Sequence, residues 1–180
     1  YPCARPTIVT AGRLVPWKGI DTLIESLTNL PLDLVVIGDG PDRTRLETRV
    51  HELGFTDRVT FMGNLSREKL LEYLKGATVF ALLSTFESFS FQLVEAMMVG
   101  TPVVAWNIGN LAEIIEDGRS GFLVAPGNRT RLIEVIEKLS HDEHLRRNIR
   151  EAAREKSKMF SVSSSVDELE KVLRGVSKSS

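Results

Sequence analysis

Residues 84–105 read STFESFSFQLVEAMMVGTPVVA, and the rest of the chain can be arranged around them. An apolar run at 79–83 precedes this stretch, and a short polar loop containing Glu87 opens it. Residues 91–98 have a helical composition, and Gly100, followed closely by a proline, should end that helix. A second apolar run begins directly afterwards. The stretch therefore predicts a strand, a loop, a helix and a further strand, with the loop leading into the helix N-terminus.

The loop and the helix carry two carboxylates, Glu87 and Glu95, around a predicted anion site. Free backbone N–H groups and the helix dipole attract anions to a helix N-terminus, whereas carboxylates repel them. The two features are compatible if the acids bind hydroxyl groups attached to the anion, as in a sugar phosphate. The spacing alone leaves an alternative open, in which Glu87 is a solvated loop residue and Glu95 a helix-surface residue.

The composition is that of an ordinary globular domain. The chain has 180 residues, of which 42% are hydrophobic and 26% charged, enough for one domain with a sizeable core. Its formal net charge of -1 gives no reason to expect nucleic-acid binding. Cys3 is the only cysteine, which excludes an internal disulfide and a cysteine-type zinc cluster. No apolar run approaches the roughly 18 residues of a transmembrane helix.

Six apolar runs alternate with helical patterns along the chain. The runs are nearly continuous, as in strands that are buried on both faces of a parallel sheet. They lie at 7–12, 32–37, 58–62, 79–83, 102–106 and 120–124. With right-handed crossovers they predict an α/β fold, a Rossmann-like, doubly wound, six-stranded parallel sheet with strand order 3-2-1-4-5-6. Ligands would then bind where the loops 13–18 and 84–90 converge, after strands 1 and 4.

The helical patterns come with local start and stop signals. Asp21, Asp42 and Ser66 are placed to cap the first three helices, and Gly54 suits the left-handed position after the second. Helices are expected at 20–27, 42–53, 66–76, 91–98, 110–116, 130–139, 141–159 and 163–174.

Arg13 and Lys18 follow the first predicted strand, across from the loop that contains the first acid. Two cations there can neutralise a diphosphate, one with a planar fork of donors and the other with a mobile point charge. The alternative is that both are ordinary surface cations. Ser90 is small and lets the backbone approach a phosphate, whereas Phe89 and Phe91 are expected in the core rather than stacked on a ligand.

Other patterns give weaker signals. The sequence GDG at 38–40 lacks the third glycine of the dinucleotide fingerprint and follows the second strand, so it does not indicate a nicotinamide oxidoreductase. His51, His141 and His144 fall on charged helices away from the predicted crevice. No catalytic triad or metal-ligand spacing is visible, and we therefore expect no metal site.

Several short motifs occur together in a recognisable order over residues 7–140. They are GRLVPWKGID at 12–21, GDGP at 38–41, VTFMG at 59–63, ESFSF at 87–91, EAM at 95–97, GTPVVA at 100–105, EI at 113–114 and DGRSGFLV at 117–124. Each is weak alone, but together they resemble glycosyltransferase family 4 (group 1). The resemblance implies the C-terminal, nucleotide-sugar-binding half of a two-domain GT-B enzyme.

The resemblance implies how the donor diphosphate would be held. Arg13 and Lys18 would bind it, and the backbone of Ser90 and Phe91 would cap it from the helix. Enzymes of this family retain the anomeric configuration and use no essential metal or other cofactor. Arg13, Lys18 and Glu87 form the expected catalytic group, in which the two cations stabilise the leaving diphosphate.

The resemblance also implies which residues would contact the remaining parts of a nucleoside-diphosphate sugar. Glu95 would bind the ribose hydroxyls, and Glu87 would bind hydroxyls of the donor sugar without acting as a general acid or nucleophile. Asn64 and Leu65, after the third strand, would meet the base. The base is left open between UDP, GDP and ADP donors, and the hexosyl group and the acceptor are unspecified.

The other half of such an enzyme is not in this sequence. Residues 1–180 are expected to form a single donor-binding domain, inactive alone, whose partner is the N-terminal acceptor domain of the same enzyme. The start at Tyr1, without an initiator Met or signal peptide, suits a piece of a longer chain. We expect a cytoplasmic location, leave peripheral membrane contact of the full-length enzyme open, and expect exposed apolar surface without the partner.

Three positions depart from the family pattern. Ser90 stands where the family often has Gly, and Asn110 and Ala112 replace a common Gly and Pro before Glu113. A function from another class is kept as an alternative: a stand-alone, non-catalytic module that binds a nucleotide or a nucleotide-sugar.

Overall fold

The sheet has six parallel strands in the order β3-β2-β1-β4-β5-β6, as the sequence predicts. The computed structural model describes residues 5–87 and 89–160. The strands are β1 (Thr7–Ala11), β2 (Asp33–Ile37), β3 (Val59–Gly63), β4 (Val79–Leu82), β5 (Val103–Trp106) and β6 (Phe122–Val124). The order reverses between β1 and β4, so the switch point lies where it was expected.

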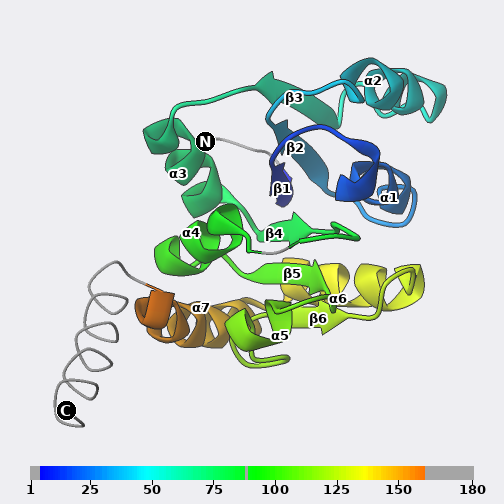
Figure 1. The fold of residues 1–180 in the computed structure, drawn as a ribbon. Coiled ribbons are helices and arrows are strands. Elements are labelled where there is room, and N and C mark those ends of the chain that lie inside the picture. Colours follow the sequence, from blue (N-terminus) through cyan, green and yellow to red (C-terminus); the bar gives the residue numbers. More distant parts are fainter. Residues whose placement is uncertain (1–4, 88, 161–180) are drawn as a thin grey trace, which may run out of the picture.

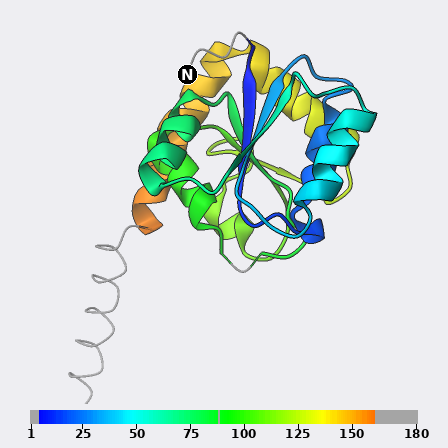
Figure 2. The ribbon, with the colours of Figure 1, turned by 90° about the horizontal axis from the view of Figure 1, so that it is seen from above.

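Helices cover both faces of this sheet. They are α1 (Ile20–Ser26), α2 (Arg43–Glu52), α3 (Arg67–Gly76), α4 (Phe91–Val99), α5 (Leu111–Ile114), α6 (Arg129–His141) and α7 (Glu143–Ser157), with 3-10 turns η1 (Pro16–Lys18) and η2 (Lys158–Phe160). Figures 1 and 2 show α1, α2 and α6 on one face and α3, α4 and α7 on the other. The helix expected at 163–174 lies outside the described residues. No described helix is long and apolar enough to cross a membrane.

The core consists of two apolar layers separated by the sheet. Because successive strand residues point to opposite faces, Ile8 packs in the layer under α1, α2 and α6, and Val9 in the layer under α3 and α4. Phe80, on the central strand β4, is fully buried. This two-sided burial explains why the strands appear in the sequence as continuous apolar runs rather than as alternating ones.

Local start and stop signals were predicted with mixed success. The Ser66 hydroxyl accepts a hydrogen bond from the Lys69 amide and caps α3, and Gly54 takes the left-handed conformation, with φ +70°. The expectation for Asp21 was wrong, because α1 begins after Gly19 and Asp21 lies within its first turn. A Cβ atom on Gly19 would lie 2.3 Å from the Leu83 carbonyl oxygen, so tertiary packing sets this helix start.

Asp42 precedes α2 but does not cap it with its side chain. Its carboxylate instead accepts two hydrogen bonds from Arg45, at 2.6 and 2.7 Å. A charge-assisted, bidentate pair is stronger than a hydrogen bond to a backbone amide. The predicted cap is therefore replaced by an ion pair, which also raises the pKa of the Arg45 guanidinium.

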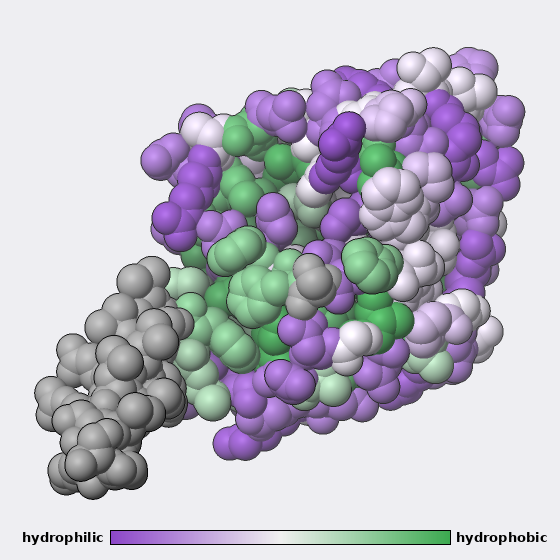
Figure 3. Space-filling model, viewed as in Figure 1, coloured by the Kyte–Doolittle hydropathy of each residue, from purple (hydrophilic) through white to green (hydrophobic). Residues whose placement is uncertain are grey.

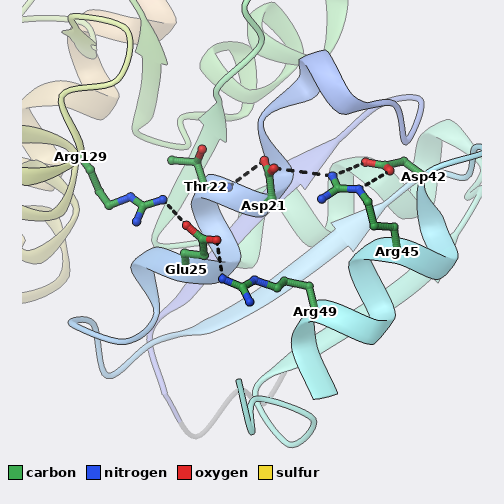
Figure 4. A network of polar contacts seen from close by, with 7 residues as sticks. All are labelled: Asp21, Thr22, Glu25, Asp42, Arg45, Arg49 and Arg129. Atoms are coloured by element: carbon green, nitrogen blue, oxygen red, sulfur yellow. Dashed lines mark hydrogen bonds and ion pairs between the residues drawn. The ribbon is translucent and has the colours of Figure 1, made fainter. Parts of the chain in front are cut away.

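A second acid ties three helices together (Figure 4). The Glu25 carboxylate on α1 accepts hydrogen bonds from Arg49 on α2, at 2.8 Å, and from Arg129 on α6. These bonds, that to Arg49 first, lower the pKa of the Glu25 carboxyl group. The cluster lies on the face opposite α3 and α4, where it links α1 to α2 and α6.

The face around the start of α4 exposes apolar side chains, as expected for this chain (Figure 3). Phe86 and Phe91 are 74% and 72% exposed, and Trp17 is 50% exposed. Phe89 is partly buried against the core and meets Phe91 edge to face, at 5.1 Å between centroids. The core assignment was wrong for Phe91, because α4 buries the face carrying Leu93 and its neighbours and the first residue of the helix points away from it.

Candidate functional site

A cavity opens at the carboxyl edge of the first three strands. Its volume is about 550 Å³. It is lined by Ala11, Gly12, Arg13, Ile37, Gly38, Asp39, Gly40, Asn64, Leu65, Leu70 and Gln92. The end of β1, the end of β2, the segment after β3 and the first turns of α3 and α4 thus meet in one hollow. Among the predicted site residues, Arg13, Asn64 and Leu65 line it directly.

Glycines in the loop after β2 allow close backbone packing at the cavity floor. Gly38 has φ +125°, and a Cβ atom there would lie 1.9 Å from the Gly12 carbonyl oxygen. A Cβ atom on Gly40 would lie 2.3 Å from the Leu14 carbonyl oxygen. The glycines of the GDG sequence therefore let the loops after β1 and β2 pack closely against each other. This close packing accounts for both glycines without a dinucleotide fingerprint. Asp39, between these glycines, was not among the predicted site residues.

The loops after β1 and β4 meet through a short ion pair. Lys18 Nζ lies 2.7 Å from Glu87 Oε2, and these side chains are only 20% and 12% exposed. The buried Ser84 hydroxyl donates to the same carboxylate oxygen at 3.2 Å. The Thr85 amide donates to the Trp17 carbonyl at 2.8 Å and fixes the loops beside each other. The convergence predicted from strand order is confirmed.

The two cations after β1 are in different situations. A Cβ atom on Gly12 would lie 3.7 Å from Lys18 Cε, so the Lys18 side chain runs beside a residue of the cavity wall. Arg13 is exposed, and no ion pair or hydrogen bond to its side chain occurs within residues 5–87 and 89–160. One cation is therefore engaged by Glu87, and the other is available.

The first turn of α4 directs polar groups toward the cavity. Ser90 is 2% exposed, and its hydroxyl accepts a hydrogen bond from the Leu93 amide at 3.3 Å. The amides of Phe91 and Gln92 have no hydrogen-bond partner in the described part of the chain. Because Gln92 lines the cavity, these free donors and the positive end of the helix dipole lie at its edge.

Glu95 lies one turn further along α4. Its Oε1 atom accepts a hydrogen bond from Arg67 Nε on α3 at 2.7 Å, and the two side chains are 16% and 70% exposed. Sequence reasoning missed Arg67. The signal available was a cation in the first turn of a helix, where acids are usually favoured.

The loop after β5 approaches Glu87 from the other side. A Cβ atom on Gly109 would lie 3.0 Å from the Glu87 carbonyl oxygen. The adjacent Asn110, one of the departures from the family pattern, has a buried Oδ1 atom without a partner in the described residues. The loop that meets Glu87 therefore carries a buried amide oxygen without the hydrogen bond that such an atom normally makes.

The predicted histidines lie elsewhere. His51, His141 and His144 are exposed on α2, α6 and α7, as expected, and none lines the cavity. Within the described residues, no three His, Cys, Asp or Glu side chains come together as metal ligands would.

The family profile described as Glycosyl transferases group 1 matches residues 3–156. The chain belongs to the glycosyl transferases group 1 family. It is 30% identical, over 178 residues, to the alpha-D-kanosaminyltransferase of Streptomyces kanamyceticus, with 96% of this chain and 46% of that protein covered. The resemblance stated from the motifs is thereby confirmed.

Solved structures give the same result. The sucrose-phosphate synthase of Thermosynechococcus elongatus superposes on this chain with a TM-score of 0.90 and 29% identity, covering 100% of this chain and 47% of that one. Anabaena HepE in complex with UDP and glucose superposes with a TM-score of 0.87 and 28% identity, covering 95% and 48%. The Rossmann-like sheet is one half of a GT-B fold, and this group 1 chain spans about half the length of these proteins.

Proposed function

We propose that this group 1 chain is the donor-binding domain of a retaining glycosyltransferase that transfers a hexosyl group from a nucleoside-diphosphate sugar. One observation carries the proposal: a free cation, a paired cation and the open amides of a helix N-terminus meet beside one cavity. Support also comes from HepE, whose crystal structures contain UDP and UDP-glucose, and which shares this fold at 28–29% identity.

The diphosphate occupies the cationic edge of the cavity. Arg13 offers a bidentate fork with no competing acid, and Lys18 offers a point charge beside the Gly12 backbone. The amides of Ser90 and Phe91 lie at the start of α4, where a helix favours anions. These groups act together because the diphosphate carries more charge than one cation can neutralise.

The nucleoside lies toward β3 and α3. A volume of about 550 Å³ is in the range of small-molecule sites and is open along Asn64 and Leu65, which we assign to the base. Glu95 accepts hydrogen bonds from the ribose hydroxyls. Its carboxylate therefore binds the neutral part of the ligand, which resolves the conflict between an acid and an anion site.

The sugar lies at the junction of the loops after β1, β4 and β5. Glu87 is the acid at this junction and accepts hydrogen bonds from sugar hydroxyls while it also holds Lys18. As the bond between sugar and diphosphate breaks, negative charge develops on the leaving group, and Arg13 and Lys18 stabilise it. The acceptor is supplied by an N-terminal domain, so residues 1–180 bind donor but do not turn over alone.

Titration calorimetry with UDP, GDP and ADP tests the proposal on the 180-residue chain. We expect one of the three to bind at up to millimolar concentration and the corresponding nucleoside to bind far more weakly, because it lacks the diphosphate. Arg13→Ala should weaken binding of the diphosphate. Arg119 is an exposed arginine outside the cavity lining, so Arg119→Ala should leave that binding unchanged. No binding of any nucleotide at millimolar concentration would overturn the proposal.

A further inference from the structure

Arg67 occupies a position that helix energetics disfavour. It is the first residue of α3, directly after the capping residue Ser66. The N-terminus of a helix carries partial positive charge, so a cation there is unfavourable, and the neighbouring Glu68 is the residue type expected. A residue that breaks a local rule without a compensating local contact often has a role set by its tertiary surroundings.

The tertiary contact of Arg67 is the carboxylate of Glu95. The guanidinium donates from Nε to Oε1 at 2.7 Å, and it joins the start of α3 to the middle of α4. The second oxygen, Oε2, has no hydrogen-bond partner in the described part of the chain. The Glu95 side chain is 16% exposed, and its carboxylate is held with one oxygen engaged and the other open.

This pair lies beside the cavity. Asn64 and Leu65 line the cavity directly before α3 begins, and Gln92 lines it one helical turn before Glu95. Arg67 and Glu95 therefore connect the two helices whose first turns form this wall. The Arg67 side chain is 70% exposed, and an ion pair with a solvent-exposed partner contributes little to fold stability, so stability alone does not account for a cation at this position.

We propose that Arg67 is a positioning residue for ribose recognition, which rests on the proposed function. It holds the Glu95 carboxylate in a fixed orientation, so that the open oxygen accepts hydrogen bonds from the vicinal ribose hydroxyls. A long acidic side chain loses rotamer freedom when it binds a ligand, and an ion pair formed beforehand removes that loss from the binding step. The site then selects ribonucleoside over deoxyribonucleoside donors.

The test compares a nucleotide with its form lacking the ribose hydroxyls. UDP, GDP and ADP are titrated first, and the one that binds most tightly is compared with its 2′,3′-dideoxy analogue. For the unsubstituted chain we expect a preference of about tenfold or more for the ribonucleotide, the value of a hydrogen bond to a charged group. Arg67→Ala should weaken ribonucleotide binding about fivefold and leave dideoxynucleotide binding unchanged. The reason is that the entropy cost of ordering the Glu95 side chain arises only for a ligand whose ribose hydroxyls bind that side chain.

Two further variants separate positioning from other effects. Arg67→Lys should restore part of the preference, because a lysine supplies the charge without the planar fork. Arg119→Ala is the matched control: Arg119 is an exposed arginine 2.7 Å from Glu116, in the loop before β6, and its removal should change neither affinity. Thermal melting should be the same for the unsubstituted chain and for Arg67→Ala.

Each outcome decides between explanations. An equal loss for both nucleotides would mean that Arg67 attracts the phosphates, and no loss for either would mean an idle surface pair; both overturn the inference and leave the proposed function intact. A loss accompanied by a lower melting temperature would make the role structural and would also overturn it. No binding of any nucleotide overturns the proposed function, and this inference with it.

Discussion

The Glu87→Gln substitution keeps the shape of the side chain that pairs with Lys18 and removes the negative charge of that side chain. In the proposed complex the same side chain serves two purposes: it accepts hydrogen bonds from the donor sugar, and it competes with the diphosphate for Lys18. The substitution should therefore act in opposite directions on two ligands. The nucleoside diphosphate should bind more tightly, and the nucleoside-diphosphate glucose should lose affinity relative to it.

The size of the effect follows from the geometry of the pair. At 2.7 Å and an effective dielectric constant of about 20, the gross attraction between Lys18 and Glu87 is about 6 kcal/mol. Desolvation of two side chains that are 20% and 12% exposed offsets most of this. We expect a net gain of about 1 kcal/mol for the diphosphate, or roughly fivefold. A lost hydrogen bond from sugar to carboxylate costs about 1.5–3 kcal/mol, so the ratio of the two Kd values should rise by about tenfold or more.

The assay is a pair of calorimetric titrations for each variant. The nucleoside diphosphate that binds best and the same diphosphate carrying glucose are titrated into the unsubstituted chain and into Glu87→Gln. Glu155→Gln is the control, because Glu155 also pairs with a lysine but is 75% exposed at the end of α7. The control should leave both Kd values unchanged, and thermal melting of each variant checks that the fold is retained.

The ratio of Kd values is the decisive quantity, because any general change in the site cancels in it. An equal change for both ligands would refute the assignment of Glu87 to the sugar. Weaker binding of the diphosphate itself would refute the competition for Lys18 and would indicate that Glu87 helps to orient that lysine.

Three other substitutions have definite expected outcomes. Glu95→Ala should weaken nucleotide binding by about tenfold in the same titrations, because the ribose loses a charged acceptor. Glu25→Gln should lower Tm by about 2–4 °C at pH 7. Because the pKa of the Glu25 carboxyl is lowered from 4.5, its stabilisation is present above that value and lost as the pH falls through the lowered pKa, so the Tm difference should shrink below pH 4. Gly38→Ala should lower Tm by about 6 °C or more, since its Cβ would lie 1.9 Å from the Gly12 carbonyl oxygen, whereas Gly127→Ala, with no atom within 4 Å of its Cβ, should cost far less.

Several features could be predicted because they depend on neighbours along the chain. Continuous apolar runs separated by helical patterns indicate strands buried on both sides, and the handedness of crossovers restricts their order. Ser66 and Gly54 act on backbone groups within a few residues of themselves, so their roles were also visible. Arg13, Lys18 and Glu87 could be chosen because residues that follow parallel strands gather at one edge of the sheet.

Errors occurred where a distant partner competed with a local rule. Asp42 binds the guanidinium of Arg45 instead of capping its helix, and the start of α1 is set by packing of Gly19 against the residue after β4 rather than by Asp21. The exposure of Phe91 depends on how α4 is rotated against the sheet. A periodic pattern defines the faces of a helix, but the docked position of that helix decides which residues at its ends remain exposed.

The sequence by itself determined the α/β class, the strand order, the family and the edge of the sheet where chemistry takes place. Only the tertiary structure decided which charges meet there: Lys18 with Glu87, 69 positions apart, and Arg67 with Glu95, 28 positions apart. Such pairs join separate elements whose spacing along the chain carries no record of their distance in space. They form because the sheet and its crossovers bring the ends of those elements together, and the side chains pair where burial makes an isolated charge costly.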